Sequence, residues 1–258
     1  MDIRLTKKDL LVFCVVLSVT FFLLGLFVSD TFNNPAIRVS SNKLVPIYKV
    51  GTKEKKIAIT LDGMWGAKNT PRLLEIFRKN GVKITFFFGG NWLEEYPHLV
   101  KEIAANGHEV GNHSYTHPHM ASLSASQIEE ELNRTGELIK NLTGKQPTVF
   151  RPPFGEYSNQ VIKSCEKLGY YPIQWSIDSL DWKDVSADFI VKRVLDNLSP
   201  GDIVLMHNNA KNTPEALTRL LPELKQRGYK VVPVSELIYK DNYYIETHTG
   251  IQKQRGAE

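Results

Sequence analysis

Three histidines stand within the segment "GNHSYTHPH", at His113, His117 and His119. Neutral imidazole is a common metal ligand, and the spacing of His113 and His117 lets two rings converge on one ion. The pair alone is also what a surface coincidence would produce, so the rest of the chain has to supply the context. His119 follows Pro118 and is interpreted as a loop residue. The segment therefore offers two of the three protein ligands that a catalytic zinc ordinarily has.

Other reactive side chains stand at or just beyond the ends of predicted strands. They come from five separate strands and comprise Asp62, the pair His113 and His117, Arg151, Asp178 with Asp181, and His207. The carboxyl ends of strands form the rim on which barrel enzymes build their active sites. A scatter of charged loop residues would show no such preference, so the pattern predicts one shared site. Asp178 is equally well explained as a hydrogen-bonding partner or a helix-entry residue.

The elements that must position these residues alternate between strand and helix. A short apolar, β-branched run occupies residues 55–62, and six further strand candidates occupy residues 83–88, 108–114, 148–153, 171–178, 202–208 and 230–238. Helical segments separate them, and Ser124 with Gln127 forms a capping-box signature at the start of one. Strict alternation implies parallel strands with right-handed crossovers, hence a barrel or a doubly wound sheet. No glycine-rich nucleotide fingerprint or phosphate loop follows the first strand, which disfavours a doubly wound nucleotide-binding fold.

The N-terminal residues predict a membrane anchor. An apolar run extends from Leu10 to Val28, and a helix of that length spans about 28 Å, which matches the hydrocarbon core of a bilayer. A cleavable signal peptide is the alternative, but its apolar region is normally shorter and ends in small residues, whereas this one ends in "LLGLFVSD". The basic residues before the run are expected to stay in the cytoplasm. The sequence thus predicts a single-pass protein of the cell membrane whose domain after Asp30 lies outside.

Composition sets the remaining limits. The formal net charge of +4 is modest and the globular part has no Lys/Arg-rich run, so nucleic acid is not expected as a partner. Cys14 lies in the apolar run and Cys165 in a helical segment, so no disulfide framework is expected. The predicted organisation is a cytoplasmic N-terminus (residues 1–9), an anchor (10–28), a polar linker (29–54), one globular domain (55–238) and a loose C-terminal tail (239–258).

Two other classes of hydrolase are disfavoured by what the chain lacks. There is no G-x-S-x-G motif, so a serine esterase of the α/β-hydrolase kind is not expected. The segment "HEVGNH" is one residue longer than the H-E-x-x-H motif of zinc proteases and contains Gly111. His108 is therefore interpreted as a structural residue.

Five ordered blocks resemble a known family. The blocks are "TLDG", "HSYTH", "RPPFG", "DSLDW" and "LMH", and the likeness covers about Lys55 to Ile238. With these blocks the chain resembles the polysaccharide deacetylases of carbohydrate esterase family four, which share the NodB homology domain. The segments "WGAKNT" and "SLDWKD" are similar to a sporulation-type bacterial branch of that family.

The resemblance implies a fold, a cofactor and a set of roles. The implied fold is a distorted (β/α) barrel with about seven parallel strands, and the implied activity is metal-dependent removal of acetyl groups from sugar polymers. By position, the resemblance assigns Asp62 as general base and His207 as general acid, with Arg151 holding Asp62 and Asp181 tuning His207. It implies that His113 and His117 bind a divalent metal, which would be zinc or else cobalt or nickel. The backbone N–H near Phe154 would stabilise the oxyanion, and Trp182 and Leu205 would line the acetyl pocket.

The chain departs from the family pattern at Gly63. Most of the family has two successive aspartates in the first block, a base followed by a metal ligand, but here Asp62 is followed by Gly63. Asp62 could itself move onto the metal, water could fill the gap, or the protein could only bind glycan. A protein that had lost its catalytic activity would have no physical reason to keep an acid such as His207 beside its partner Asp181. The sequence therefore predicts an N-deacetylase acting on an amino-sugar polymer such as peptidoglycan, with a non-catalytic glycan-binding surface or sporulation protein as the alternative.

Overall fold

The computed structural model describes residues 17, 20 and 43–256. The predicted cytoplasmic N-terminus and membrane anchor lie outside the described residues, apart from Leu17 and Thr20. Within the described part of the chain, no helix combines the length and the hydrophobicity that a membrane span requires. The residues from Leu44 onward form one compact unit, and the functional residues predicted above all belong to it.

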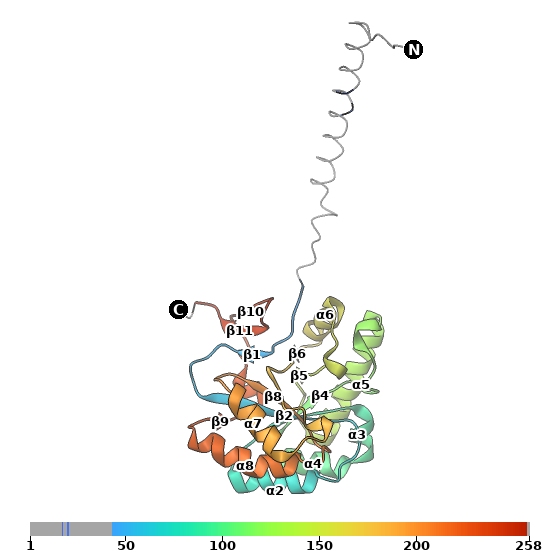
Figure 1. Ribbon diagram of the computed structural model, residues 1–258. Helices are drawn as coiled ribbons and strands as arrows, with labels where there is room; N and C mark the ends of the chain where they lie inside the picture. The colour runs from blue at the N-terminus through green and yellow to red at the C-terminus, as the bar shows by residue number, and fades with distance from the viewer. Residues whose placement is uncertain (1–16, 18–19, 21–42, 257–258) are drawn as a thin grey trace, which may run out of the picture. The chain divides into compact units, whose positions relative to one another are not determined.

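The centre of this unit is a parallel sheet (Figure 1). Its strands follow the order β6-β5-β4-β3-β2-β8-β7, and β9 pairs with the start of β2. The bounds are β2 Lys56–Gly63, β3 Thr85–Phe88, β4 Glu109–Asn112, β5 Val149–Phe150, β6 Tyr171–Pro172, β7 Ile177–Asp178, β8 Ile203–His207 and β9 Lys230–Val231. The predicted parallel barrel-like sheet is thereby confirmed. Strand β2 lies between β3 and β8 in its interior, and its residues are buried along almost the whole strand.

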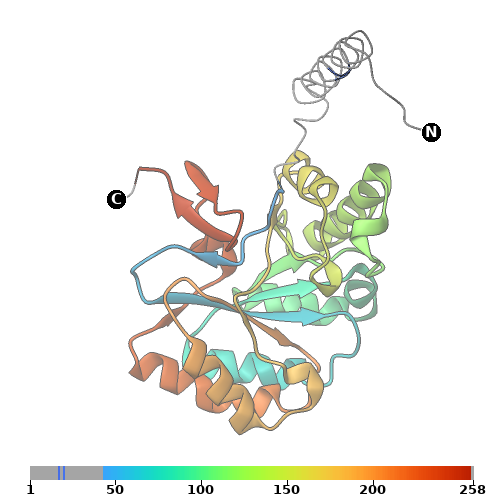
Figure 2. The same cartoon turned by 45° about the horizontal axis from the view of Figure 1, so that its top comes forward.

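Helices cover the sheet between successive strands. Their bounds are α2 Thr70–Asn80, α3 Gly90–Glu95, α4 Pro97–Ala105, α5 Ala125–Thr143, α6 Asn159–Lys167, α7 Ala187–Asn197, α8 Thr213–Gln226 and α9 Val234–Leu237, and single turns of 3₁₀ helix occupy η1 Met120–Ser122, η2 Pro153–Gly155 and η3 Asp181–Lys183. In Figures 1 and 2, α2, α7 and α8 lie along one flank of the sheet, while α5 and α6 lie along the other. The largest apolar core lies between the sheet and helices α2, α4, α7 and α8.

Local sequence signals explain several helix ends. The Ser124 side chain accepts from the Gln127 backbone N–H, and the Ser124 backbone N–H donates to Gln127 Oε1, so the predicted capping box is present at the start of α5. Helix α2 has Pro71 in its first turn and ends at Asn80, and Gly81 caps it with φ +65°. Glycine is favoured there because a left-handed backbone strains any residue that carries a Cβ.

Both ends of the unit are more ordered than predicted. Residues 44–54 were predicted to be linker, yet Ile47 and Val50 are buried, and β1 (Lys49–Val50) pairs with β11 (Ile251–Gln254). The predicted loose tail folds into an antiparallel hairpin of β10 (Tyr243–Ile245) and β11, drawn in red beside the blue β1 in Figure 1. Apolar residues scattered among polar ones are buried here by strands distant in sequence, which no local pattern reveals.

The N-terminal segment also forms backbone hydrogen bonds with the main sheet and with the residues before β8. Strands β6 and β7 are the two ends of the sheet order. The Ile47 backbone N–H donates to the Pro172 carbonyl at 2.9 Å, and the Gln174 N–H donates back to the Ile47 carbonyl at 2.7 Å. Farther along, the Val50 N–H donates to the Gly201 carbonyl at 2.9 Å. The segment thus lies against the β6 edge and reaches the residues that precede β8.

Candidate active site

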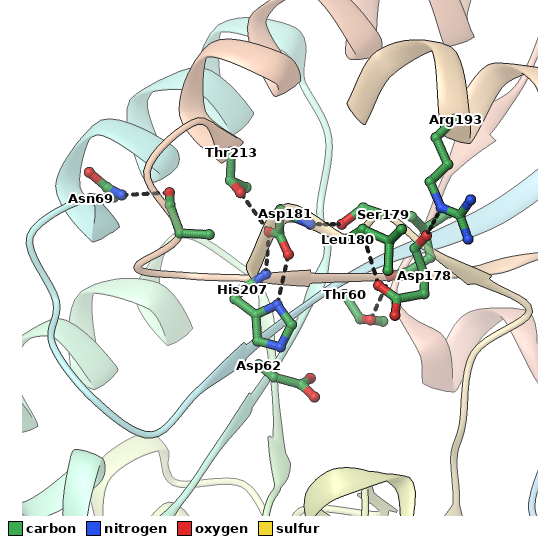
Figure 3. A network of polar contacts seen from close by, with 12 residues as sticks. Thr60, Asp62, Asn69, Asp178, Ser179, Leu180, Asp181, Arg193, His207 and Thr213 are labelled. Atoms are coloured by element: carbon green, nitrogen blue, oxygen red, sulfur yellow. Dashed lines mark hydrogen bonds and ion pairs between the residues drawn. The ribbon is translucent and has the colours of Figure 1, made fainter. Parts of the chain in front are cut away.

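Two titratable side chains face each other across neighbouring strands. Asp62 on β2 and His207 on β8 are direct partners in the parallel register, and the Asn208 backbone N–H donates to the Asp62 carbonyl at 3.0 Å. Partners in register project to the same face of a sheet, so both side chains reach the same rim. Figure 3 shows the Asp62 carboxylate beside the His207 ring, each near the end of its strand.

Asp62 is held by a buried guanidinium. Arg151 Nη1 donates to Asp62 Oδ1 at 2.6 Å and to Thr60 Oγ1 at 2.7 Å, and Arg151 Nη2 donates to the Gln174 carbonyl at 3.0 Å. The guanidinium carbon lies 4.3 Å from the centre of the Phe87 ring. Arg151 is fully buried, so its charge is compensated mainly by Asp62. One carboxylate oxygen of Asp62 is therefore fixed, while Oδ2 faces the cavity.

His207 is paired with a buried carboxylate. His207 Nδ1 lies 2.8 Å from Asp181 Oδ1, while Asp181 Oδ2 accepts from the His207 backbone N–H at 2.7 Å and from Thr213 Oγ1 at 2.5 Å (Figure 3). Burial lowers the pKa of the His207 imidazole, but the hydrogen bond and charge of Asp181 outweigh it, so the net pKa lies above its usual value. Nδ1 is used by Asp181, and Nε2 remains to exchange a proton with a bound molecule.

His113 and His117 are both neutral at neutral pH. Burial lowers the pKa of His113, and burial followed by the proximity of His113 lowers the pKa of His117 to about 4. The Arg151 carbonyl is 2.8 Å from His113 Nδ1, so that nitrogen carries the hydrogen. His113 Nε2 is then unprotonated and lies 3.8 Å from Asp62 Oδ2. The two rings are 5.0 Å apart at their centroids.

These residues fit a divalent metal only in part. Neutral imidazole is the form that binds a metal, and the carbonyl on His113 Nδ1 is the usual way of orienting such a ligand. However, no group of three His, Cys, Asp or Glu side chains that could hold a metal occurs among the described residues. A catalytic zinc ordinarily has three protein ligands. Within the part of the chain that the structure describes, the donor set is one ligand short of such a centre.

The space expected for that ligand is filled. A Cβ at Gly63 would lie 2.5 Å from Phe88 Cε1 and 3.0 Å from Asn208 Cγ. Phe88 is fully buried and stacks on Trp92 with ring centroids 3.7 Å apart. Packing at this position therefore disfavours any residue larger than glycine.

Left-handed backbone conformations gather in the predicted blocks. Ser114 and His117 have φ of +63° and +61°, Phe154 has +58° and Leu180 has +60°. Each is a non-glycine residue, for which this conformation costs on the order of 1 kcal/mol. Such strain persists where the surrounding structure fixes the backbone, which is common at functional sites.

The predicted side chains meet around one cavity of about 680 Å³. Seven of the predicted site residues line it, namely Asp62, His113, His117, Phe154, Trp182, Leu205 and His207. Arg151 and Asp181 lie behind this wall and contact the cavity through Asp62 and His207. Asp178 also lines the cavity, and its Oδ1 accepts from the Leu180 backbone N–H at 2.8 Å, which fits the hydrogen-bonding role.

The remaining histidines and aromatic residues near the site differ in burial. His119 lies on an exposed loop with its Nδ1 2.9 Å from Glu156 Oε2, and His108 is buried against Phe77 and Phe86. Trp92 and Tyr115 are buried packing residues, whereas Trp175 lines the cavity. Sequence reasoning assigned no site role to Trp65, Asn208, Asn209 or Thr213. The sequence signal that could have indicated a role for Trp65 was its position three residues after the candidate base Asp62.

Comparisons with known proteins give a consistent result. Residues 49–173 match the family model described as polysaccharide deacetylase. The peptidoglycan-N-acetylmuramic acid deacetylase PdaA of Bacillus subtilis is 34% identical over 197 residues, which cover 75% of this chain and 75% of that protein. The protein YlxY of Bacillus subtilis is 35% identical over 204 residues, or 79% of this chain. The matched region is only 64% of YlxY, less than two thirds of its length.

A solved structure adds a contrasting relative. A pseudoenzyme of carbohydrate esterase family four from Bacillus anthracis superimposes with a TM-score of 0.73 and 36% sequence identity, covering 82% of this chain and 73% of that one. A mutant of the same protein, at 40% identity, is described as having restored enzymatic activity. The same architecture thus occurs both in deacetylases and in a relative described as a pseudoenzyme.

Proposed function

This chain belongs to the polysaccharide deacetylase family, carbohydrate esterase family four, whose enzymes hydrolyse the amide bond of N-acetyl amino sugars, and we propose that its own substrate is peptidoglycan or a related amino-sugar polymer. The observation that carries the proposal is the in-register pair of Asp62 and His207 at one cavity, with His207 backed by buried Asp181. Amide hydrolysis needs a base for water and an acid for the departing amine, and this pair supplies both.

The proton transfers follow from the side chains. Asp62 has Oδ1 fixed by Arg151, so its free Oδ2 accepts a proton from the attacking water. His207 holds a proton because of Asp181, and its Nε2 delivers one to the amine as the carbon–nitrogen bond breaks. We assign the backbone N–H of Phe154 to the oxyanion, and Trp182 and Leu205 to the acetyl methyl, because all three residues line the same cavity.

A divalent metal is a separate part of the proposal. His113 and His117 would hold it, with zinc as first choice and cobalt or nickel as alternatives. When bound, such an ion would lower the pKa of a water and polarise the acetyl carbonyl. Among the described residues only these two ligands support it, so the proton transfers above are assigned to the protein alone.

The test is acetate release by the purified full-length protein from peptidoglycan and from a hexamer of N-acetylglucosamine. We expect release that a chelator stops and zinc or cobalt restores. Asp62→Asn and His207→Gln should each lower kcat by at least about 100-fold, which is the usual contribution of a general acid or base. His113→Ala should abolish the metal response, whereas His98→Ala, on the exposed face of α4, should match the parent. Full activity in His113→Ala would refute the metal assignment.

A second candidate is a protein that binds glycan without hydrolysing it. The gap at Gly63 and the likeness to a pseudoenzyme leave this alternative open. It predicts hexamer binding by the parent protein with no acetate release under any metal condition. Zinc titration of the purified protein separates the two functions further, because micromolar binding is hard to explain without a role for the ion.

We also propose that the domain lies outside the cell on a membrane anchor. The support is the apolar run over residues 10–28 and its basic flank. Protease added to intact cells should cleave the domain from the membrane fraction, and cleavage only after lysis would refute this location.

A further inference from the structure

Trp65 is the most exposed large hydrophobic side chain in the described part of the chain, with 68% of its surface open to solvent. It lies three residues after Asp62, in the loop between β2 and α2, and it lines the cavity of the candidate site. Covering an indole is energetically favourable, so a folded chain gains by burying it. An exposed aromatic ring at the mouth of a cavity therefore indicates a binding surface.

The loop that carries Trp65 is fixed in place. The Gly66 carbonyl accepts from the Trp92 indole N–H at 2.8 Å and from Asn208 Nδ2 at 3.1 Å. Gly66 adopts φ +68°, a backbone conformation that favours glycine, and a Cβ there would lie 2.5 Å from Asn209 Nδ2. Because its neighbour is anchored by two side chains, the Trp65 ring is presented to solvent by a defined backbone.

The surroundings of Trp65 suit a sugar. Its ring makes an edge contact with His117, at 5.1 Å between centroids, and this covers only part of the indole. The exposed side-chain amide of Asn209 lies against the same loop and lines the same cavity. Phe154 and Trp182, 57% and 55% exposed, add two further aromatic rings to the cavity wall. Indole matches the apolar C–H face of a pyranose, and an amide matches its hydroxyl groups.

We propose that Trp65 and Asn209 form a sugar-binding subsite that holds the pyranose ring next to the acetylated sugar of a polysaccharide. The nature of the polymer rests on the proposed function, whereas binding itself requires no reaction. The subsite would make the protein prefer polymer to single sugars, because only a polymer occupies Trp65 and the reaction centre together.

The experiment compares the full-length parent with Trp65→Ala, using a hexamer of N-acetylglucosamine and the monomer as probes. We expect Trp65→Ala to raise the hexamer Kd and KM about tenfold and to leave kcat unchanged, the pattern for binding energy present equally in ground and transition states. The monomer KM should change less than about twofold. Trp65→Phe, which keeps an aromatic ring, should recover most of the affinity. Phe189→Ala, on an exposed ring of α7 outside the cavity, is the matched control.

The outcomes separate the subsite from the proposed function. If the parent releases acetate but Trp65→Ala binds the hexamer as tightly as the parent, the subsite is wrong and the function stands. If the parent releases no acetate yet Trp65→Ala weakens hexamer binding, the subsite stands and the function falls. A drop in kcat on monomer and hexamer alike, with an unchanged hexamer Kd, would show instead that Trp65 only positions His117, and this would overturn the subsite.

Discussion

Replacing Gly63 by alanine tests whether packing alone explains the glycine in the first block. The new Cβ would lie 2.5 Å and 2.7 Å from two ring carbons of Phe88 and 3.0 Å from Asn208 Cγ. Neither neighbour can move easily. Phe88 is buried and stacked on Trp92, and the Asn208 side chain is bonded to the Gly66 carbonyl. A single methyl group therefore has to displace a packed ring.

The expected magnitude comes from two opposing effects. Gly→Ala at an ordinary φ stabilises a protein by about 0.4–1 kcal/mol through the unfolded state. Overpacking a core costs about 1–3 kcal/mol. The free energy of unfolding of Gly63→Ala should therefore fall by about 1–2 kcal/mol, which lowers Tm by about 2–8 °C for a domain of this size.

Urea unfolding followed by circular dichroism measures this change, and a double-mutant cycle with Phe88→Leu identifies its cause. The smaller leucine should relieve the crowding, so the two substitutions together should cost at least about 1 kcal/mol less than the sum of their separate effects. By the same reasoning, zinc should bind Gly63→Asp combined with Phe88→Val more tightly than Gly63→Asp alone. A Gly63→Ala protein as stable as the parent, or costs that simply add, would refute the packing argument.

Three further predictions concern the buried titratable groups. Asp181→Asn removes the charge that raises the pKa of His207, so burial then lowers this pKa and the imidazole loses its proton at lower pH. The alkaline limb of the pH profile of kcat/KM should therefore move to lower pH. An alkaline limb at the same pH as in the parent would contradict the assignment of His207 as the acid. Arg151→Met leaves the Asp62 carboxylate buried without its ion-pair partner, so it should abolish acetate release. It should also lower the free energy of unfolding, measured by urea titration, by about 3–5 kcal/mol. A variant as stable as the parent would contradict the importance of this ion pair. Burial lowers the pKa of His108 to about 4, so between pH 6.5 and 4 the unfolded chain binds a proton at this residue that the folded chain does not. The free energy of unfolding should therefore fall as the pH is lowered from 6.5 to 4, and it should fall less in His108→Gln. An equal fall in both proteins would show that His108 does not contribute to this pH dependence.

The rim of the site could be predicted from the sequence because the fold brings strand ends together. Asp62, Arg151 and His207 each follow a short apolar run, and strict alternation with helices implies parallel strands. In such a sheet the carboxyl ends share one edge, so residues far apart in the sequence meet there. The in-register pairing of Asp62 with His207 is the direct result.

The parts that could not be predicted depend on contacts between distant segments. Strand β1 is two residues long, and its partner β11 lies about 200 residues later, so neither has a recognisable local pattern. The segment 230–238 was predicted as one strand, but it contains β9 and then α9, because Pro233 cannot donate to a ladder and caps a short helix instead. Gly63 was visible as a missing ligand, whereas its packing against Phe88 required the structure.

The arrangement behind His207 bears on whether the protein is a catalyst or only a glycan binder. Asp181 is completely buried, and burying a carboxylate costs several kcal/mol unless donors surround it. Its three donors come from the His207 ring, the His207 backbone and Thr213, and apolar residues of similar volume would be neutral or stabilising for the fold. A groove that merely holds sugar gains nothing from an imidazole with a raised pKa, whereas an acid for a departing amine needs one. His207→Gln should therefore stop acetate release while hexamer binding persists, and release at the parent rate would remove the argument for catalysis at this residue.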